Sequence, residues 1–163
     1  MKIKLDRLRT LKAECEALVA QNAFSFATDT RLTRLGVMAK KTIEREAGEA
    51  LRGINTKRNE LYQQVVKDNP SADQQAISSI YLADSRSKEI MDLQAEIWAE
   101  ETDFEFKPIP IGIDEVKKEN FEKSVTVEYY GYSHHINPNM CLQGLITEGF
   151  AEVSELDETA QRE

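Results

Sequence analysis

The feature that most constrains the fold is helical apolar periodicity from Arg31 to about Val66, followed by a second run from Ser71 to about Asp103. In the first run, small or apolar residues recur at steps of three and four, which places them on one helical face. They are Leu32, Leu35, Ala39, Ile43, Ala47, Ala50, Ile54, Leu61 and Val65. The second run carries Ile77, Ile80, Ile90, Met91, Ile97 and Trp98. The two runs predict a long antiparallel helical hairpin.

Polar residues and a proline mark the ends of these helices. Asp29 or Thr30 is suited to cap the first helix, because a side-chain oxygen accepts hydrogen bonds from unpaired backbone N–H groups. The segment 68–70 ends that helix, since proline disfavours a helical conformation in the residue before it. Ser71 followed by Gln74 is a capping-box pattern and predicts the start of the second helix.

Charge is distributed unevenly along the chain. Residues 1–66 contain 13 Lys/Arg and 8 Asp/Glu, a net +5, whereas residues 67–163 contain 8 and 21, a net −13. With the turn near Asn69, position 100 lies opposite about position 39, so an acidic cluster faces a basic one. Exposed ion pairs each contribute less than about 1 kcal/mol, so the pattern favours complementary solvated faces over a binding surface. The two clusters are Glu96, Glu100, Glu101 and Asp103, and Arg31, Arg34, Lys40 and Lys41.

Length and composition indicate one domain with long helices. The chain has 163 residues, of which 31% are charged, which fits helices with exposed flanks better than a compact sandwich. A net charge of −8 argues against general nucleic-acid or membrane binding. Cys15 and Cys141 lack metal-type spacing. Because neither a signal peptide nor a run of about 18 apolar residues is present, we expect a cytosolic protein.

The residues before the hairpin predict a strand and a helix. Lys2–Leu5 alternates polar and apolar side chains, which is typical of a short edge strand. Asp6 is placed to cap a helix that extends to about Gln21. In the connector that follows, Phe24 and Phe26 are expected to pack into the core. The apolar face of the helix comprises Leu8, Leu11, Cys15, Leu18 and Val19.

After the hairpin, residues 104–150 predict a small β-containing part of the same domain. Prolines favour an extended segment at Pro108–Ile113, and Val125–Tyr130 is rich in β-branched and aromatic residues. Asn137-Pro138 is typical of a helix start, and Gly149 is suited to close that helix.

The expected fold class is therefore mainly α, or α+β. A long antiparallel hairpin and an N-terminal helix dominate, with a short C-terminal helix and one small β element formed by Lys2–Leu5, Pro108–Ile113 and Val125–Tyr130. A single domain spans residues 1–150. Residues 151–163 are acidic and poor in apolar side chains, so they are expected to form a disordered tail.

Two pairs of acids provide the sharpest enzymatic hypothesis. Glu46 and Glu49, and Glu89 and Asp92, are three apart, so each pair shares a helical face. The expected register places position 46 opposite about 93 and position 49 opposite about 90, where four carboxylates would bind Mg²⁺. The pattern resembles that of all-α nucleoside triphosphate pyrophosphohydrolases. The alternative is that these acids pair with neighbouring basic residues, and then no metal or other cofactor is expected.

The segment 129–135 combines aromatic residues with two adjacent histidines. Neighbours in an extended segment point to opposite faces, so His134 and His135 do not readily share a metal ion, even with Cys141 nearby. Aromatic clusters favour binding surfaces, although packing into a core is an equal alternative. The candidate binding residues here are Tyr129, Tyr130, Tyr132 and His134.

Three features together resemble a family of tailed-phage proteins of unknown function, mostly from siphophages of Gram-positive bacteria. They are the Lys2-Ile3-Lys4-Leu5 start, the long hairpin, and the exit Ile109–Glu115. The resemblance spans most of residues 1–150, whereas the Tyr/His-rich stretch 129–135 and the acidic tail depart from it. It implies a phage protein in the cytoplasm of the bacterial host cell, with no catalytic residues to transfer.

These observations favour a non-enzymatic, phage-encoded binding protein that acts as an assembly or host-directed factor. Its partner would be a second copy in a homodimer, a phage protein or a host protein. One alternative is an anti-defence inhibitor that blocks a host immune effector, or that sequesters a small nucleotide signal through Arg31, Arg34, Lys40 and Lys41. A further alternative is the Mg²⁺-dependent pyrophosphohydrolase.

Overall fold

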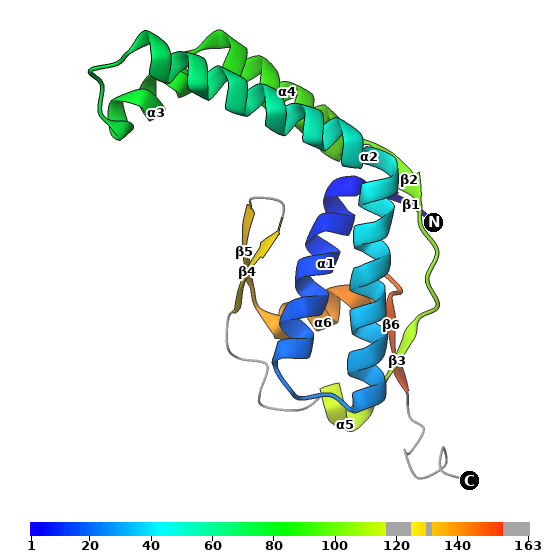
Figure 1. Cartoon of the computed structure of the whole chain (residues 1–163). Coiled ribbons are helices and arrows are strands. Elements are labelled where there is room, and N and C mark those ends of the chain that lie inside the picture. Colours follow the sequence, from blue (N-terminus) through cyan, green and yellow to red (C-terminus); the bar gives the residue numbers. More distant parts are fainter. Residues whose placement is uncertain (117–124, 130–131, 155–163) are drawn as a thin grey trace.

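The computed structural model describes residues 1–116, 125–129 and 132–154, and confirms a mainly α fold with short strands. Figure 1 shows a helical body from which a long helical arm projects. The elements in chain order are β1 (Lys2–Lys4), α1 (Leu5–Ala20), α2 (Phe26–Asp68), α3 (Gln74–Ala83), α4 (Ser85–Ala99), β2 (Glu101–Asp103), β3 (Ile109–Gly112), α5 (Ile113–Val116), β4 (Val125–Tyr129), β5 (Tyr132–Ile136), α6 (Pro138–Thr147) and β6 (Ala151–Ser154).

Helix α2 belongs to both parts of the molecule. It has 43 residues and begins earlier than predicted, because Ser25 is its N-cap and accepts a hydrogen bond from the Thr28 backbone N–H at 3.3 Å. The predicted caps Asp29 and Thr30 are wrong, since both lie within the first turns of the helix. Phe26 is the first helical residue and is 88% exposed, so its predicted burial is also wrong.

The returning arm of the hairpin consists of two helices rather than one. Asp73, not Ser71, caps α3 by accepting a hydrogen bond from the Ala76 N–H at 2.8 Å. Asp84 then ends α3 and caps α4, where its carboxylate accepts from the Arg86 N–H at 2.8 Å. Residues 69–84 therefore form the tip of the arm instead of a tight turn.

This tip changes the predicted register of α2 and α4. Ile90 packs in one cluster with Leu61, whereas the prediction placed position 90 opposite position 49. The Arg58 guanidinium donates a hydrogen bond to the Gln94 side-chain oxygen, which agrees with the shifted pairing. Glu100 lies at the start of α1, where its carbonyl accepts from the Leu5 N–H at 2.9 Å. The predicted alignment of the acidic cluster with the basic cluster at position 39 is therefore wrong.

The body is built around the pairing of α1 with the N-terminal half of α2 (Figure 1). The predicted apolar face of α1 is confirmed, with only Val19 half-buried. The predicted cap Asp6 is wrong, because α1 begins at Leu5 directly after β1 and no side chain caps it. Side chains from the C-terminal segments complete this core, which includes Leu8, Leu11, Leu18, Leu32, Leu35, Ile43, Ile109, Ile111, Leu142, Leu145 and Phe150.

The strands form three separate two-stranded sheets rather than the single β element that was predicted. β1 pairs antiparallel with β2, with Ile3 opposite Thr102. β3 pairs parallel with β6, and β4 pairs antiparallel with β5. Each predicted strand thus pairs with a segment that the sequence did not indicate. Residues 151–154, expected in the disordered tail, form β6, and residues 155–163 lie outside the described part.

The short C-terminal helix agrees with its prediction. Asn137 caps α6 by accepting hydrogen bonds from the Asn139 and Met140 N–H groups at 3.0 and 3.4 Å, and Pro138 is the first helical residue. Gly149 follows the helix with φ of +82°, in the left-handed region that favours glycine.

Candidate functional site

The four basic residues predicted to bind a nucleotide do not converge. All four lie exposed on the N-terminal half of α2, which belongs to the body. They are Arg31, Arg34, Lys40 and Lys41. Helical geometry places Lys40 about 100° around the helix from Lys41, and Arg31 lies about 15 Å from Lys41 along the axis. They form a basic surface along α2 rather than a pocket.

The candidate residues of segment 129–135 share the β4–β5 hairpin, which packs against α1 through Ile136. Tyr129 is opposite Tyr132, and His134 is opposite Val127. Tyr130 lies outside the described residues. The structure therefore brings the backbones of Tyr129, Tyr132 and His134 together in one small sheet.

A cleft of about 660 Å³ is lined by residues of this hairpin, of α1 and of α6. The His135 ring Nδ1 lies 3.0 Å from the Thr126 hydroxyl, and the Cys141 thiol is half-buried in the cleft wall. Burial raises the pKa of Cys141 to about 12, so the thiol stays protonated near neutral pH and is a poor nucleophile and metal ligand. The lining residues are Thr10, Glu14, Ser133, His135, Ile136, Asn137, Met140 and Cys141.

The structure does not bring the two acid pairs together. Glu46 interacts with Arg45, whose Nε donates to the carboxylate at 3.0 Å, on the α2 segment next to the body. Glu89 lies farther along the arm on α4, where it lines a groove between α2 and α4. The predicted convergence is wrong because the register is shifted. Within residues 1–116, 125–129 and 132–154, no group of three or more His, Cys, Asp or Glu side chains is placed to bind a metal ion.

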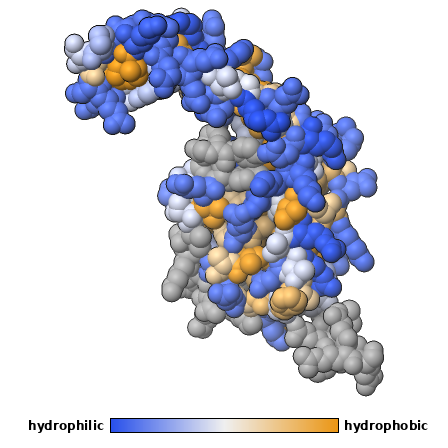
Figure 2. Space-filling view, viewed as in Figure 1, coloured by the Kyte–Doolittle hydropathy of each residue, from blue (hydrophilic) through white to orange (hydrophobic). Residues whose placement is uncertain are grey.

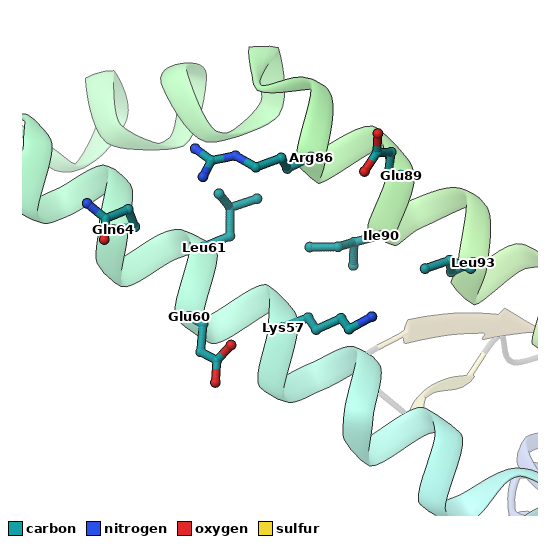
Figure 3. Close-up of a pocket in the computed structure, with 8 residues that line it drawn as sticks. All are labelled: Lys57, Glu60, Leu61, Gln64, Arg86, Glu89, Ile90 and Leu93. Carbon is teal, nitrogen blue, oxygen red and sulfur yellow. The ribbon is translucent and has the colours of Figure 1, made fainter.

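The first candidate site is a groove on the arm, called here the arm groove. It lies between α2 and α4 and has a volume of about 390 Å³. In Figure 3, Leu61 and Ile90 point toward one another between the helices, the Lys57 and Arg86 side chains extend along the groove, and Glu60 points away from it. Leu93, at one end, is 41% exposed. The lining residues are Lys57, Glu60, Leu61, Gln64, Arg86, Glu89, Ile90 and Leu93.

The outer surface of the arm is otherwise hydrophilic with scattered apolar residues. Figure 2 shows hydrophilic residues over most of the arm in this view, with a hydrophobic patch near its tip. The large apolar residues exposed on the arm are Val66, Ile80, Leu82, Met91 and Leu93. Small apolar grooves bordered by charged side chains are suited to bind a helix of another protein.

The second candidate site is called here the junction pocket, because it lies where α2 bends away from the body (Figure 1). It has a volume of about 320 Å³. The Arg52 Nη1 atom is 3.3 Å from the Glu44 Oε2 atom, and this contact passes over Gly48. A Cβ at position 48 would lie 2.7 Å from that carboxylate oxygen. The lining residues are Glu44, Gly48, Leu51, Arg52, Ile54, Asn55, Arg58, Gln94 and Trp98.

Sequence reasoning missed the junction pocket because it depends on the register of α4. Gln94 and Trp98 lie next to positions 48–58 because residues 69–84 form the tip of the arm and thereby shift the register of α4 relative to α2. The local signal was two glycines, Gly48 and Gly53, in an otherwise regular helix, which is where helices commonly bend. That signal does not say which side chains fill the bend.

Comparison with known protein families, curated proteins and solved structures finds no match to this chain. In the described part of the chain, no helix has both the length and the apolar character needed to cross a membrane.

Proposed function

We propose that the chain is a non-enzymatic binding protein of a tailed phage, and that it acts in the host cytoplasm as an assembly or host-directed factor. The phage origin is supported by the resemblance of the Lys2–Leu5 start, the hairpin and the Ile109–Glu115 exit to tailed-phage proteins. A binding role is supported by the arm groove, which lies on the projecting arm between α2 and α4 and leaves the Leu93 side chain 41% exposed.

The arm groove is the single observation that carries this proposal. A partner helix placed along the groove would cover Leu93 and pack beside Leu61 and Ile90, which are already buried between α2 and α4. Lys57 extends along the groove and would meet a carboxylate of that helix, which favours an amphipathic partner with acidic residues, whereas Arg86 already pairs with Asp84 through its Nε and Nη2 atoms. A second copy of the arm is the homodimer form of the same proposal.

The test is a pair of matched substitutions on α4. Leu93→Glu introduces a charge at the groove, whereas Met91→Glu introduces it at a residue that is 57% exposed and does not line the groove. Each variant is supplied in trans to a phage that lacks the gene, and plaque yield is measured. We expect Leu93→Glu to lower the yield and Met91→Glu to support normal growth. Equal yields with both variants would contradict the proposal, provided that their melting curves match the parent.

Two further measurements identify the kind of partner. Light scattering at micromolar concentration tests the homodimer, since Leu93→Glu would convert a dimer into a monomer. Plating on otherwise identical hosts with and without a defence system tests the anti-defence alternative. A defect of Leu93→Glu that is confined to defended hosts would indicate an inhibitor of an immune effector, and a defect on every host would indicate assembly or general host takeover.

A further inference from the structure

We infer that the junction pocket binds a small organic anion that carries a planar apolar group, the chemical class of nucleoside phosphates. This site is separate from the arm groove, and the inference does not rest on the function proposed for the arm. It combines two guanidinium groups, an amide and an apolar floor in a volume of about 320 Å³. Ligand pockets range from about 300 to 1,000 Å³, so the space suits a mononucleotide.

The cationic side of the pocket is formed by Arg52 and Arg58. The Arg52 side chain is 71% exposed and contacts the Glu44 carboxylate, and Arg58 donates to Gln94. Across the described residues, these are the side-chain contacts of the two guanidiniums, and each uses one of five N–H donors. The remaining donors suit phosphate oxygens, which guanidinium groups bind through paired hydrogen bonds.

Asn55 strengthens this assignment by its position. It is three residues from both Arg52 and Arg58, so its amide lies on the helical surface between the two guanidiniums. The amide N–H₂ is a neutral donor to the same oxygens. The spacing along α2 from position 52 to position 58 is about 9 Å, which side chains of arginine length can span to reach one phosphate group.

The apolar side of the pocket is formed by Leu51, Ile54 and Trp98. The indole of Trp98 is buried, and the Arg9 guanidinium carbon lies 4.9 Å from the ring centroid, in a cation–π contact that orients it. Ile54 and Trp98 keep only 6% and 5% of their surface exposed, and Leu51 is half-buried. A ligand with a flat ring would therefore contact chiefly Leu51 and the accessible edges of Ile54 and Trp98 while its phosphate stays at the arginines.

Glu44 and Gly48 determine which ligand groups can bind beside Arg52. The absence of a side chain at position 48 leaves room for the Glu44 carboxylate to cross toward Arg52. Their contact of 3.3 Å is longer than a typical charge-assisted hydrogen bond, so a phosphate can compete for Arg52. Glu44 would then accept hydrogen bonds from hydroxyl or amino groups of the ligand.

Trp98 supplies a direct assay, because it is the only tryptophan in the chain. The full-length protein is titrated with adenosine 5′-monophosphate, and binding is followed by tryptophan emission and by calorimetry. We expect saturable binding of the monophosphate that is at least about tenfold tighter than binding of adenosine or of pyrophosphate, because each comparison compound lacks one half of the recognised chemistry. Adenosine 5′-triphosphate tests whether additional phosphates are accommodated.

Three variants connect the binding to the pocket. Arg52→Gln and Arg58→Gln are each expected to weaken binding at least about tenfold, in line with the loss of a charge-assisted hydrogen bond. Arg45→Gln is the matched control, since Arg45 is an exposed arginine of α2 that does not line the pocket. Arg52→Lys, which keeps the charge, is expected to retain part of the affinity.

Two results would overturn the inference. The first is absence of saturable binding of either adenine nucleotide at millimolar concentration. The second is equal weakening by Arg45→Gln and by the two pocket variants, which would indicate attraction to the charge of α2 rather than a site. Melting curves of the variants accompany each titration, so that a loss of folding is recognised, and Arg52→Lys provides the folded comparison if Arg52→Gln is unstable.

Discussion

The two halves of α2 experience different surroundings, although they belong to one continuous helix. In the body, α2 packs against α1, and the side chains of Leu32, Leu35 and Ile43 are wholly buried. In the arm, α2 packs against α3 and α4, and the buried residues of that cluster keep 3–7% of their surface exposed. The described residues place 21 side chains in the main body core but only five in the arm core.

Because of this difference, the body contributes most of the folding free energy, whereas the candidate binding sites lie on the arm or at its base. Fully burying a leucine-sized side chain contributes about 1.5–3 kcal/mol, so the body holds most of the folding free energy. The arm consists of α3, α4 and the C-terminal half of α2 around one narrow apolar seam, and its surface is mostly hydrophilic with scattered exposed apolar residues (Figure 2). One candidate site lies on the arm and the other at its base, where Trp98 of the body core lines the pocket together with exposed residues of α2 such as Arg52.

The largest effect is expected from an alanine substitution in the body. Leu35→Ala should lower the free energy of unfolding by about 2–5 kcal/mol, because the side chain is wholly buried between helices and leaves a cavity. Leu61→Ala in the arm should cost less, since Leu61 already lines an open groove. Urea denaturation followed by circular dichroism measures both. Equal losses would show that the arm is as tightly integrated as the body.

The next effect concerns a partly buried ion network that fastens α6 to α1. The Arg7 Nη2 atom donates to Glu14 at 2.8 Å, and its Nε donates to Glu148 at 2.8 Å. Burial disfavours the charged guanidinium, but the hydrogen bonds that Arg7 donates to Glu148 and Glu14 raise the pKa of Arg7 overall. Arg7→Leu should cost about 2–3 kcal/mol, less than the roughly 3–5 kcal/mol expected in full burial, because Arg7 is 24% exposed.

The exposed ion pair between Lys2 and Asp103 provides the control for Arg7. Its nitrogen–oxygen distance is 3.0 Å, but both side chains are mostly exposed. Lys2→Leu should therefore change the free energy of unfolding by less than about 1 kcal/mol. If both variants lose the same amount in chemical denaturation, the burial of the Arg7 network contributes nothing to stability.

A substitution in the arm should stabilise the protein. The Ser87 hydroxyl is buried in the arm, and no hydrogen-bond partner for it is found among the described residues. Ser87→Ala removes this unpaired group and favours the helix, so the free energy of unfolding should rise by about 1 kcal/mol. Ser78→Ala, at an exposed position of α3, is the matched control and should have a smaller effect. A destabilised Ser87→Ala would indicate that the hydroxyl is bonded in solution.

The smallest effect is a pH dependence of the arm tip. Hydrogen bonds from the Arg86 side chain and then from its backbone N–H lower the pKa of Asp84 to about 2. Because the folded pKa is below the unfolded value, this stabilisation is present above about pH 4 and is lost as the pH falls toward 2. Amide exchange in α3 and α4 should therefore accelerate over that range.

Asp84→Asn tests the origin of this pH dependence. Asparagine keeps the capping oxygen but does not titrate, so the acceleration attributed to Asp84 should disappear. Asp92→Asn removes a carboxylate elsewhere on α4 that caps no helix and is the control. An unchanged pH profile in Asp84→Asn would assign the effect to other carboxylates.

Local patterns in the sequence predicted the helices well. The apolar steps that begin at Leu8 and at Leu32 identified most of the buried faces of α1 and α2, because residues three and four apart share a face in any α-helix. Ala50 of the predicted stripe is exposed, as are Ile80 and Met91 of the second run, which are 38% and 57% exposed. Asn137 and Gly149 were also placed correctly, since capping depends on neighbouring backbone groups. The predicted caps failed where a residue nearer the true start, such as Ser25, competed for the same role.

The candidate sites were much less predictable. The acid pairs that begin at Glu46 and Glu89 formed a plausible metal site only under a register that the arm tip changes. Arg52 and Arg58 attracted no attention in the sequence, because their significance comes from Trp98, which is 40 positions or more away along the chain. The sequence shows the chemical type of each side chain, but which side chains meet in one site depends on how distant segments pack.

The sequence by itself therefore determined the mainly helical fold, the buried face of α1 and most of that of α2, the acidic overall charge and the end of α2 before Pro70. Only the tertiary structure decided that residues 69–84 form a tip, that α4 pairs with Leu61 through Ile90, and that each short strand pairs with the segment it does. The physical reason is the distance along the sequence between the groups that interact. Helix formation and capping involve backbone groups a few residues apart, whereas register and strand pairing depend on burial between segments up to a hundred residues apart, as in the pairing of Ile3 with Thr102.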